Sequence, residues 1–153
     1  MKIFWQDLHH RDLTTTQLYS LLALRNAVFV VEQRCAYLDI DGEDLTGNNR
    51  HILGVAGGRL VACARILAPE HADKSVKIGR VTVAAEARGL QLGNRLMEQA
   101  IGSCEKYWRQ QAISLSAQAH LRRFYHRLGF SAVSAEYLED GIPHIDMQRN
   151  PRD

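Results

Sequence analysis

A chain of 153 residues, 46% of them hydrophobic, is long enough to bury a substantial core, and we expect one domain over residues 1–153. The formal charge of +2 and the scattered basic residues argue against a nucleic-acid-binding surface. No signal peptide or long apolar run is recognisable, which argues against a membrane protein and predicts a cytoplasmic one.

The three cysteines form an odd set without metal-ligand spacing, as in proteins of a reducing compartment. Each is interpreted as a small buried apolar residue, although Cys35 lies in a predicted loop and would be reactive if exposed. The histidines do not indicate a metal site either. His9 and His10 would point apart on a strand, and His120 and His126 would lie on different faces of a helix. We therefore expect no bound metal.

The first predicted helix begins at a capping box formed by Thr14 and Gln17 and runs to about Gln33. Its apolar stripe comprises Leu18, Leu21, Leu22, Val28 and Phe29. Arg25 and Glu32 fall in phase with Leu18, Leu22 and Phe29, so both charges are expected to point inward.

Alternating apolar residues predict strands at 2–8, 51–56, 59–67, 76–84, 113–117, 132–137 and 144–148. An acidic loop (37–50) and a polar loop (69–74) separate some of them, and Gly57-Gly58 predicts a hairpin turn. Further helices are predicted at 91–108 and 120–128. The order β-α-β-β-β-α-β-α-β-β predicts an α/β fold of the mixed α+β kind, with a mostly antiparallel sheet of six or seven strands.

The segment 81–97 changes from strand to helix periodicity within one turn. The first N–H groups of a helix have no partner within it and carry partial positive charge, so such a turn is suited to an anion. The first turn of this helix has Asn94 and Arg95 in place of acidic residues, and Arg88 precedes it. Because Rossmann and Walker spacings are both absent, these residues indicate a diphosphate held by backbone amides, or else an ordinary turn.

Arg88-Gly89-Leu90-Gln91-Leu92-Gly93 resembles the Arg/Gln-x-x-Gly-x-Gly/Ala pyrophosphate loop of the GNAT superfamily of CoA-dependent acyltransferases. The middle glycine of that motif is Gln91 here. Since the loop binds through backbone amides, a glutamine that points to solvent is compatible with it. This predicted arrangement of the loop around a pyrophosphate, the pyrophosphate clamp, would be wrong, however, if the loop required a positive φ at Gln91.

A second segment, 124–130, resembles the later Tyr-x-x-x-Gly-Phe motif of that superfamily, with Gln118 where many members have Asn. Resemblance to the ElaA-type branch is carried by segments 24–33, 39–53, 116–121 and 139–145. The likeness covers nearly the whole chain. It implies a GNAT-like mixed sheet with splayed central strands and helices on both faces, and it leaves the acceptor open.

The resemblance also implies acetyl-CoA as co-substrate, its pantetheine arm lying along a strand edge and its pyrophosphate in the turn. The implied cofactor-binding residues are Val81, Thr82, Val83, Arg88, Gly89, Leu90, Gln91, Leu92, Gly93, Asn94, Arg95 and Gln118. The outer phosphate would meet one of four arginines, unless these are solvated helix-face residues: Arg88, Arg95, Arg122 and Arg123.

Transfer of an acetyl group from a thioester to an amine requires a neutral amine, stabilisation of an oxyanion and a proton for the thiolate. The resemblance places Tyr125 where the family commonly has its general acid, although a tyrosine on a short helix usually serves packing. We expect the N–H of Val83 or of a neighbour to polarise the thioester carbonyl.

Glu32 is the first candidate for the general base, because an inward carboxylate is desolvated and its pKa is raised. Structural pairing of Glu32 with Arg25 or Arg65 would explain the same position. His51 and His144 are alternative proton carriers. The residues expected to bind substrate are Arg25, His51, Arg65 and His144.

These residues favour an enzyme that moves an acetyl group from acetyl-CoA to a primary amine of a small molecule, a protein lysine or an N-terminus. The alternative is a non-catalytic acyl-CoA-binding or protein-partner module. The acidic residues at 39–44 would attract a cationic amine or else form a solvated loop. Strand edges or the final hairpin would permit a homodimer.

Overall fold

The computed structural model describes residues 2–71 and 74–151, so residues 72–73 of the expected polar loop lie outside the described part. Within that part the strands are β1 (Phe4–His9), β2 (Arg50–Ala56), β3 (Arg59–Leu67), β4 (Val76–Val83), β5 (Ile113–Gln118), β6 (Ser131–Ala132), β7 (Tyr137–Glu139) and β8 (Ile142–Arg149). The helices are α1 (Thr15–Arg25), the π-helix η2 (Asn26–Glu32), α2 (Leu92–Tyr107) and α3 (Arg122–Arg127). Short 3₁₀ segments are η1 (His10–Asp12), η3 (Ala85–Ala87) and η4 (Ala119–Leu121).

The strands form one sheet in the order β1-β2-β3-β4-β5-β8-β6, with β7 also paired to β8. Neighbours are antiparallel except β4 and β5, which are parallel. The predicted mixed, mostly antiparallel sheet is therefore confirmed. The described residues form an 8-stranded sheet, in place of six or seven strands, because the segment expected as one strand at 132–137 is divided into β6 and β7. These two pair with different stretches of β8.

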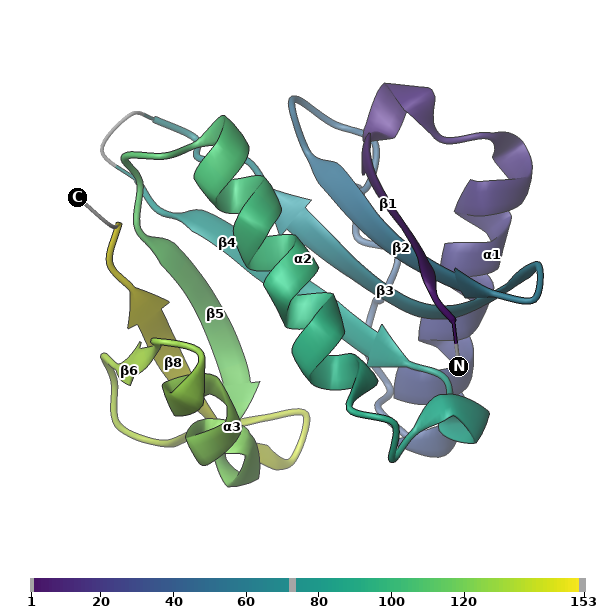
Figure 1. Cartoon of the computed structure of the whole chain (residues 1–153). Helices are drawn as coiled ribbons and strands as arrows, with labels where there is room; N and C mark the ends of the chain where they lie inside the picture. Colours follow the sequence, from purple (N-terminus) through teal and green to yellow (C-terminus); the bar gives the residue numbers. More distant parts are fainter. Residues whose placement is uncertain (1, 72–73, 152–153) are drawn as a thin grey trace.

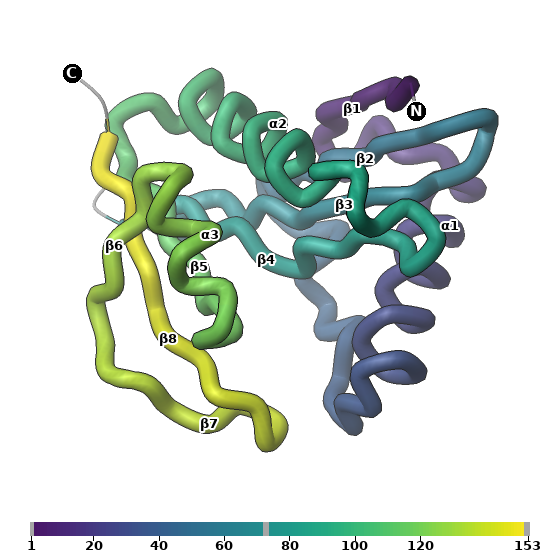
Figure 2. The backbone as a smooth tube through the Cα atoms, turned by 60° about the horizontal axis from the view of Figure 1, so that its bottom comes forward, coloured from purple at the N-terminus to yellow at the C-terminus, as the bar shows by residue number. Residues whose placement is uncertain are grey.

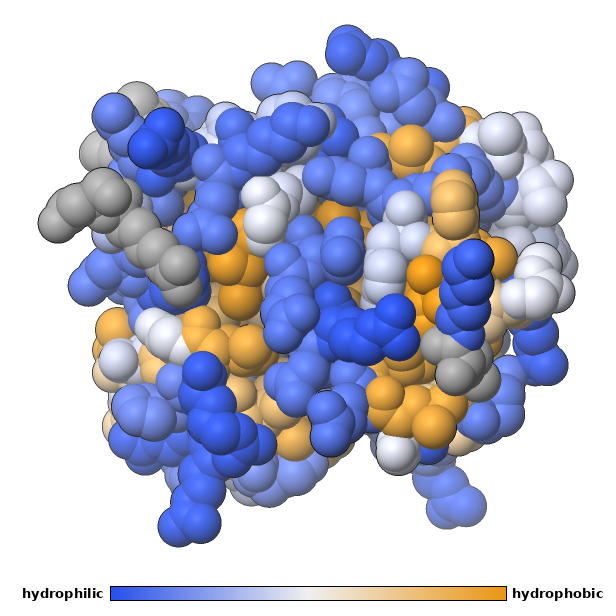
Figure 3. Space-filling view, in the orientation of Figure 1, coloured by the Kyte–Doolittle hydropathy of each residue, from blue (hydrophilic) through white to orange (hydrophobic). Residues whose placement is uncertain are grey.

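Helices cover both faces of the sheet, as expected. Helices α2 and α3 lie on one face, and α1 with η2 lies on the other (Figures 1 and 2). The buried face of α2 contributes Leu92, Leu96, Met97, Ala100, Ile101 and Cys104 to the core. Its outer face forms the hydrophilic band across the middle of Figure 3, with apolar residues visible on either side of it.

The two central strands are splayed, which confirms another expectation. β4 and β5 pair only at Val76 with Ile113 and at Lys77 with Ser114. Beyond Lys77 the two strands have no further ladder pairs and diverge, as the separation of their ribbons in Figure 1 illustrates. The side of β4 that faces β5 is therefore an unpaired edge inside the sheet.

The first helix differs from its prediction in a way that matters for the site. The capping box at Thr14 is confirmed, but the α-helix ends at Arg25 and the next segment is the π-helix η2. The N–H of Gln33 donates to the carbonyl of Val28 at 2.9 Å, an i→i−5 bond. A π-helix has more residues per turn and so changes the phase of the side chains. Arg25 is buried as expected, whereas Glu32 lies on the outside.

All three cysteines are buried free thiols. Burial raises the pKa of Cys35, with a further contribution from the negative charge of Asp140. The thiolate is the reactive form, so the alternative of a reactive Cys35 is contradicted and the interpretation as a buried apolar residue is supported.

Candidate active site

A β-bulge in β4 adjoins the splay. Cys63 on β3 pairs with Thr82 on β4, and Arg65 pairs with Gly79. The stretch of β4 between these two pairs is therefore one residue longer than the stretch of β3 opposite it. Arg80, within this longer stretch, has a φ of 52°, in the left-handed region that non-glycine residues seldom adopt. A bulge bends its strand and redirects the main chain. It therefore helps to turn β4 away from β5.

Past the bulge, the main chain of β4 alternates between β3 and the open edge. The N–H of Ala84 donates to the carbonyl of Val61 at 2.8 Å, so the main-chain groups of Val83 point the other way, toward β5. Val81 and Val83 are half-buried along this edge. Thr82 is buried, and its hydroxyl donates to the carbonyl of Arg80 at 2.8 Å. Of the three residues predicted on this strand, Val81 and Val83 alternate toward the edge, whereas Thr82 is turned toward β3.

The turn before α2 contains the predicted motif, and its backbone departs from the expectation. Gln91 is the N-terminal cap of α2, with a φ of 57° and a ψ of 26°. The predicted pyrophosphate clamp assumed that Gln91 has a negative φ, so this prediction of the loop backbone is wrong. A left-handed residue followed by a right-handed one turns successive N–H groups into a concave anion-binding nest. The glycine of the family motif takes this conformation without strain, whereas a residue with a side chain incurs a cost of roughly 1–2 kcal/mol.

The first turn of α2 presents backbone donors. Its first intrahelical bond runs from the N–H of Arg95 to the carbonyl of Gln91 at 3.3 Å. Among the described residues, no protein acceptor is found for the preceding N–H groups, those of Leu92, Gly93 and Asn94. The start of α3 lies close by, since a Cβ on Gly93 would be 3.6 Å from the Phe124 ring. Donors from one helix and basic residues from the next are thereby brought together.

Other predicted residues of the loop have distinct positions. Gly89 has a φ of 84°, and Leu90 is 45% exposed. The guanidinium of Arg95 lies 5.9 Å from the centroid of the Trp5 ring, which directs it toward β1. Arg122 and Arg123 are exposed at the start of α3.

Glu32 is held by Arg88, contrary to both interpretations of its role. Arg88 donates from Nη2 to Oε1 at 2.9 Å and from Nη1 to Oε2, forming a two-pronged ion pair. The hydrogen bond from Arg88 lowers the pKa of Glu32. An inward position and a raised pKa were the reasons for naming Glu32 as the base, and the structure contradicts both. Pairing with Arg25 or Arg65 is also wrong.

Arg25 and Arg65 are buried and bound to carboxylates of the acidic loop. Arg25 donates from Nε to Asp39 at 3.0 Å and from Nη1 to Asp44 at 2.6 Å. Arg65 Nη1 donates to Asp41 at 2.8 Å and to Asp44 at 3.2 Å. These bonds fasten the loop to α1 and β3. Both guanidinium groups are engaged by the protein itself, so their predicted role in binding substrate is contradicted.

Two of the four acidic side chains at 39–44 are buried and paired, while Asp41 and Glu43 lie at exposed positions. Asp39 and Asp44 are buried, and Arg80 adds an ion pair to Asp39 at 2.8 Å. Burial raises the pKa of Asp44, but the hydrogen bond and charge of Arg25, together with Arg65, lower it by more. The loop is thus an internal ion-pair network.

His51 lies beneath the same loop. Its Nε2 is 2.9 Å from the carbonyl oxygen of Asp44, and because a carbonyl only accepts, this nitrogen carries the proton. Burial lowers the pKa of the imidazole. A buried ring with its Nε2 proton committed to the backbone holds the loop, so the predictions that His51 carries protons or binds substrate are wrong.

Tyr125 is buried on α3, between two other aromatic rings. Its ring centroid lies 5.0 Å from that of Phe124 and 6.1 Å from that of Phe130, both edge-on. Burial raises the pKa of Tyr125 to about 12. Within the described residues no hydrogen-bond partner is found for its hydroxyl. The phenol therefore keeps its proton at neutral pH without donating it to the protein.

Gln118 and His144 are directly opposite each other on β5 and β8. Gln118 Nε2 donates to Gln33 Oε1 at 3.5 Å, so the end of β5 is linked to the residue that follows η2. His144 is partly buried, and its Nδ1 is 2.7 Å from the carbonyl oxygen of Ile142. The structure therefore brings Gln118 and His144 together, at a place separate from the buried ion-pair network of Arg25 and Asp44.

Residues that the sequence did not single out share this sheet face. The Tyr137 hydroxyl donates to Asp146 at 2.5 Å, and the Ser116 hydroxyl donates to the same carboxylate at 2.9 Å. Alternation along β5 and β8 places Ser116 beside Gln118 and Asp146 beside His144. The period-two pattern was therefore the signal that would have found them.

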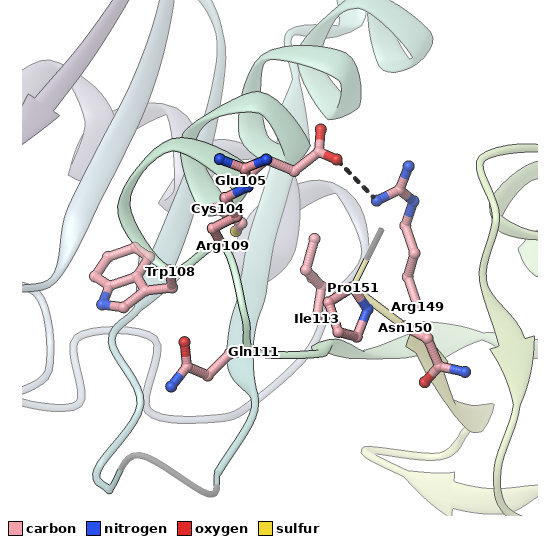
Figure 4. Close-up of a pocket in the computed structure, with 9 residues that line it drawn as sticks. All are labelled: Cys104, Glu105, Trp108, Arg109, Gln111, Ile113, Arg149, Asn150 and Pro151. Atoms are coloured by element: carbon pink, nitrogen blue, oxygen red, sulfur yellow. Dashed lines mark ion pairs between the residues drawn. The ribbon is translucent and has the colours of Figure 1, made fainter. Parts of the chain in front are cut away.

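One pocket lies away from these residues. A cavity of about 160 Å³ at the C-terminal end of α2 is lined by residues such as Trp108, Arg109 and Asn150, and Arg149 pairs with Glu105 across it at 3.5 Å (Figure 4). It contains none of the predicted site residues. The described side chains include no group of three or more His, Cys, Asp or Glu placed to hold a metal. In the same part of the chain, no helix combines the length and apolarity needed to cross a bilayer.

Comparison with known proteins agrees with this geometry. The family described as an acetyltransferase (GNAT) domain matches residues 19–151. Protein ElaA of Escherichia coli (strain K12) is 54% identical over 147 residues, 96% of each chain. The crystal structure of Escherichia coli ElaA has a TM-score of 0.94 and 52% identity, covering 97% of this chain and 100% of that one.

A second solved structure, of an acyl-CoA N-acyltransferase from Pseudomonas aeruginosa, has a TM-score of 0.93 and 48% identity, covering 97% of this chain and 99% of that one. The resemblance seen in the two sequence motifs is thereby confirmed along the chain. With its splayed central strands and the open helix start beside them, this protein belongs to the GNAT family of acyltransferases.

Proposed function

We propose that the protein is an N-acetyltransferase that moves the acetyl group of acetyl-CoA directly to a primary amine of a small molecule or of a protein lysine or N-terminus. One observation carries the proposal: the unpaired edge of β4 leads into the free N–H groups at the start of α2. An acyl-CoA has an extended, amide-rich arm joined to a diphosphate. Its two parts match this edge and this helix start in order.

The donor would be bound mainly by the backbone. The edge at Val81 and Val83 would pair with the amides of the pantetheine arm, and the nest that begins at left-handed Gln91 would hold the pyrophosphate. Exposed Arg122 and Arg123 at the adjoining start of α3 are suited to the outer phosphate. Gln118, at the end of the splayed β5, would meet the arm from the other side.

The chemistry would use one donor on each side of the thioester. The N–H of Val83, which faces the open edge, would polarise the carbonyl as the oxyanion develops. Tyr125 would give its proton to the departing thiolate, since burial raises its pKa to about 12 and the phenol is therefore protonated at neutral pH. The C–N bond to the amine forms as the C–S bond of the thioester breaks.

The experiment that tests the proposal measures free thiol released from acetyl-CoA in the presence of a panel of primary amines, lysine-containing peptides and free N-terminal peptides. We expect amine-dependent thiol release well above hydrolysis. Thermal stabilisation by acetyl-CoA in a protein that releases no thiol with any acceptor would favour the non-catalytic binding module and reject the enzyme.

A further inference from the structure

We propose that His144 is the general base of the reaction and takes a proton from the acceptor amine through its Nε2 atom. This assignment rests on the proposed acetyl transfer and adds to it the residue that makes the amine nucleophilic. It starts from the ring's hydrogen bonds and from its place relative to Tyr125.

The hydrogen bond at Nδ1 fixes which nitrogen is basic. Nδ1 lies 2.7 Å from the carbonyl oxygen of Ile142, and since a carbonyl only accepts, Nδ1 carries the proton in the neutral ring. Nε2 then holds a lone pair. The same Nδ1–H bond persists when Nε2 is protonated, so the ring changes charge without rotating.

The ring of His144 has an acidic and an aromatic neighbour. Glu139 Oε2, on β7, is 3.5 Å from Nε2 and would pair with the imidazolium. The ring stacks on Tyr137, with centroids 6.2 Å apart. Along the chain, Asp146 lies two residues farther on β8 and Asp140 lies in the turn before it, and both are acidic. Across the ladder, Gln118 on β5 is neutral.

His144 is placed on the opposite side of β5 from the general acid. Ala117 packs in the core with Tyr125, so Gln118, the next residue, faces the other side of the sheet. Directly opposite residues of an antiparallel pair have Cβ atoms about 5 Å apart, which puts His144 beside Gln118 on that side. Figure 2 shows the β7–β8 hairpin and the segment after α1 projecting there, away from α2.

The remaining candidates for the base are occupied. Glu32 is ion-paired to Arg88, and the pair lowers its pKa. His51 is buried, with its Nε2 proton donated to the carbonyl of Asp44. Among the described residues, the Nε2 atom of His144 faces only the exposed carboxylate of Glu139 at 3.5 Å, and 13% of its side chain is accessible.

The proton balance closes with two residues. His144 removes the first proton from the ammonium form of the acceptor and later releases it to solvent. The neutral amine attacks the thioester carbon, the C–N bond forms, and the C–S bond breaks. Tyr125 protonates the thiolate, and the second amine proton, lost from the tetrahedral adduct, restores the phenol. The net products are the amide, free CoA and one proton.

The test compares His144→Gln with the wild-type protein, using thiol release across pH with the best amine of the panel. Because a general base contributes 10²–10⁴-fold, we expect kcat/KM near neutral pH to fall by roughly 100-fold or more. The difference in kcat/KM between His144→Gln and the wild type should shrink as the pH approaches the range in which the amine deprotonates by itself. Thermal stabilisation by acetyl-CoA should be unchanged. The matched control is His71→Gln, at an exposed loop position, which should behave as the wild type.

A second variant, Glu139→Gln, separates a catalytic role from a structural one. Loss of the carboxylate removes the acidic partner of Nε2, so kcat/KM should fall, but by less than in His144→Gln, while stabilisation by acetyl-CoA stays unchanged. Wild-type kcat/KM in His144→Gln across the whole pH range would overturn the assignment of His144 and leave acetyl transfer intact. If the wild-type protein itself releases no thiol with any amine, the proposed function fails, and the assignment fails with it.

Discussion

Arg88 joins Glu32 to the carbonyl of Val83. Its guanidinium donates to both carboxylate oxygens of Glu32 and, from Nε and Nη2, to the Val83 oxygen at 3.3 and 3.1 Å. One side chain thus connects the end of the π-helix η2 with the strand edge proposed for pantetheine. The arginine of the predicted phosphate motif is thus engaged by two protein groups.

The first prediction concerns that ion pair. Glu32→Gln removes a negative charge beside the proposed phosphate site and releases Arg88, so acetyl-CoA should bind a few-fold more tightly, on the order of the effect of one nearby charge. Since Glu32 is not the base, the pH dependence of kcat should be unchanged. Calorimetric titration with acetyl-CoA measures the first effect, with exposed Glu70→Gln as control. Loss of the acidic limb in Glu32→Gln would restore Glu32 as the base.

The second prediction concerns the general acid. Tyr125→Phe keeps the ring and its packing but removes the proton donor, so kcat should fall by roughly 100-fold or more while acetyl-CoA binding stays nearly intact. Because the pKa of Tyr125 is raised to about 12, the wild-type rate should show no alkaline loss from this group up to pH 10 or thereabouts. Tyr19→Phe, 76% exposed, is the matched control. Undiminished turnover in Tyr125→Phe would remove the residue from the mechanism.

The third prediction concerns acid stability. Burial raises the pKa of Asp41, but hydrogen bonds from Arg65 and the Glu43 N–H outweigh it and bring the pKa from 3.8 to about 2. A folded-state pKa below the unfolded value contributes stability that is complete above the unfolded pKa and is lost as the pH falls through the folded one. The free energy of unfolding should therefore decline between about pH 4 and pH 2. Urea denaturation at stepped pH measures this decline.

The same network predicts a large effect at neutral pH. Asp44→Asn leaves the buried charges of Arg25 and Arg65 undercompensated, and breaking a buried pair typically costs about 3–5 kcal/mol. Asp12→Asn, at an exposed position, should cost far less. Equal denaturation midpoints for the two variants would contradict the structural role given to the acidic loop.

The fourth prediction concerns the backbone conformation at Gln91 and at two glycines. Gln91→Gly removes a side chain from a left-handed position and should stabilise the protein by up to about 1 kcal/mol, with acetyl-CoA binding retained because the amides remain. Gly89→Ala, at a φ of 84°, should destabilise it by about 1–2 kcal/mol. Gly102→Ala, on α2 with open space around it, should be stabilising. Thermal denaturation ranks the stability of the three variants. An increase in the stability of Gly89→Ala would refute the positive φ assigned to Gly89.

Local signals were the ones that could be predicted. The capping box at Thr14, the Gly57-Gly58 turn and the helix after residue 91 depend on neighbours a few residues away, and each appears as expected. The loop before α2 was located correctly, but its backbone was not. A left-handed φ at Gln91 has no signature in a glutamine side chain, and only the family's glycine at that position indicated it.

The sequence by itself determined the family and most of the order of the elements, because periodicity and short motifs are local properties. Only the tertiary structure decided which charged residues belong to the site. Arg88 meets Glu32 across 56 positions, and Arg25 meets Asp44 across 19. The π-helical turn changes the phase on which the inward position of Glu32 was inferred. Charges find their partners through space, so the base had to be assigned from contacts made by the folded chain.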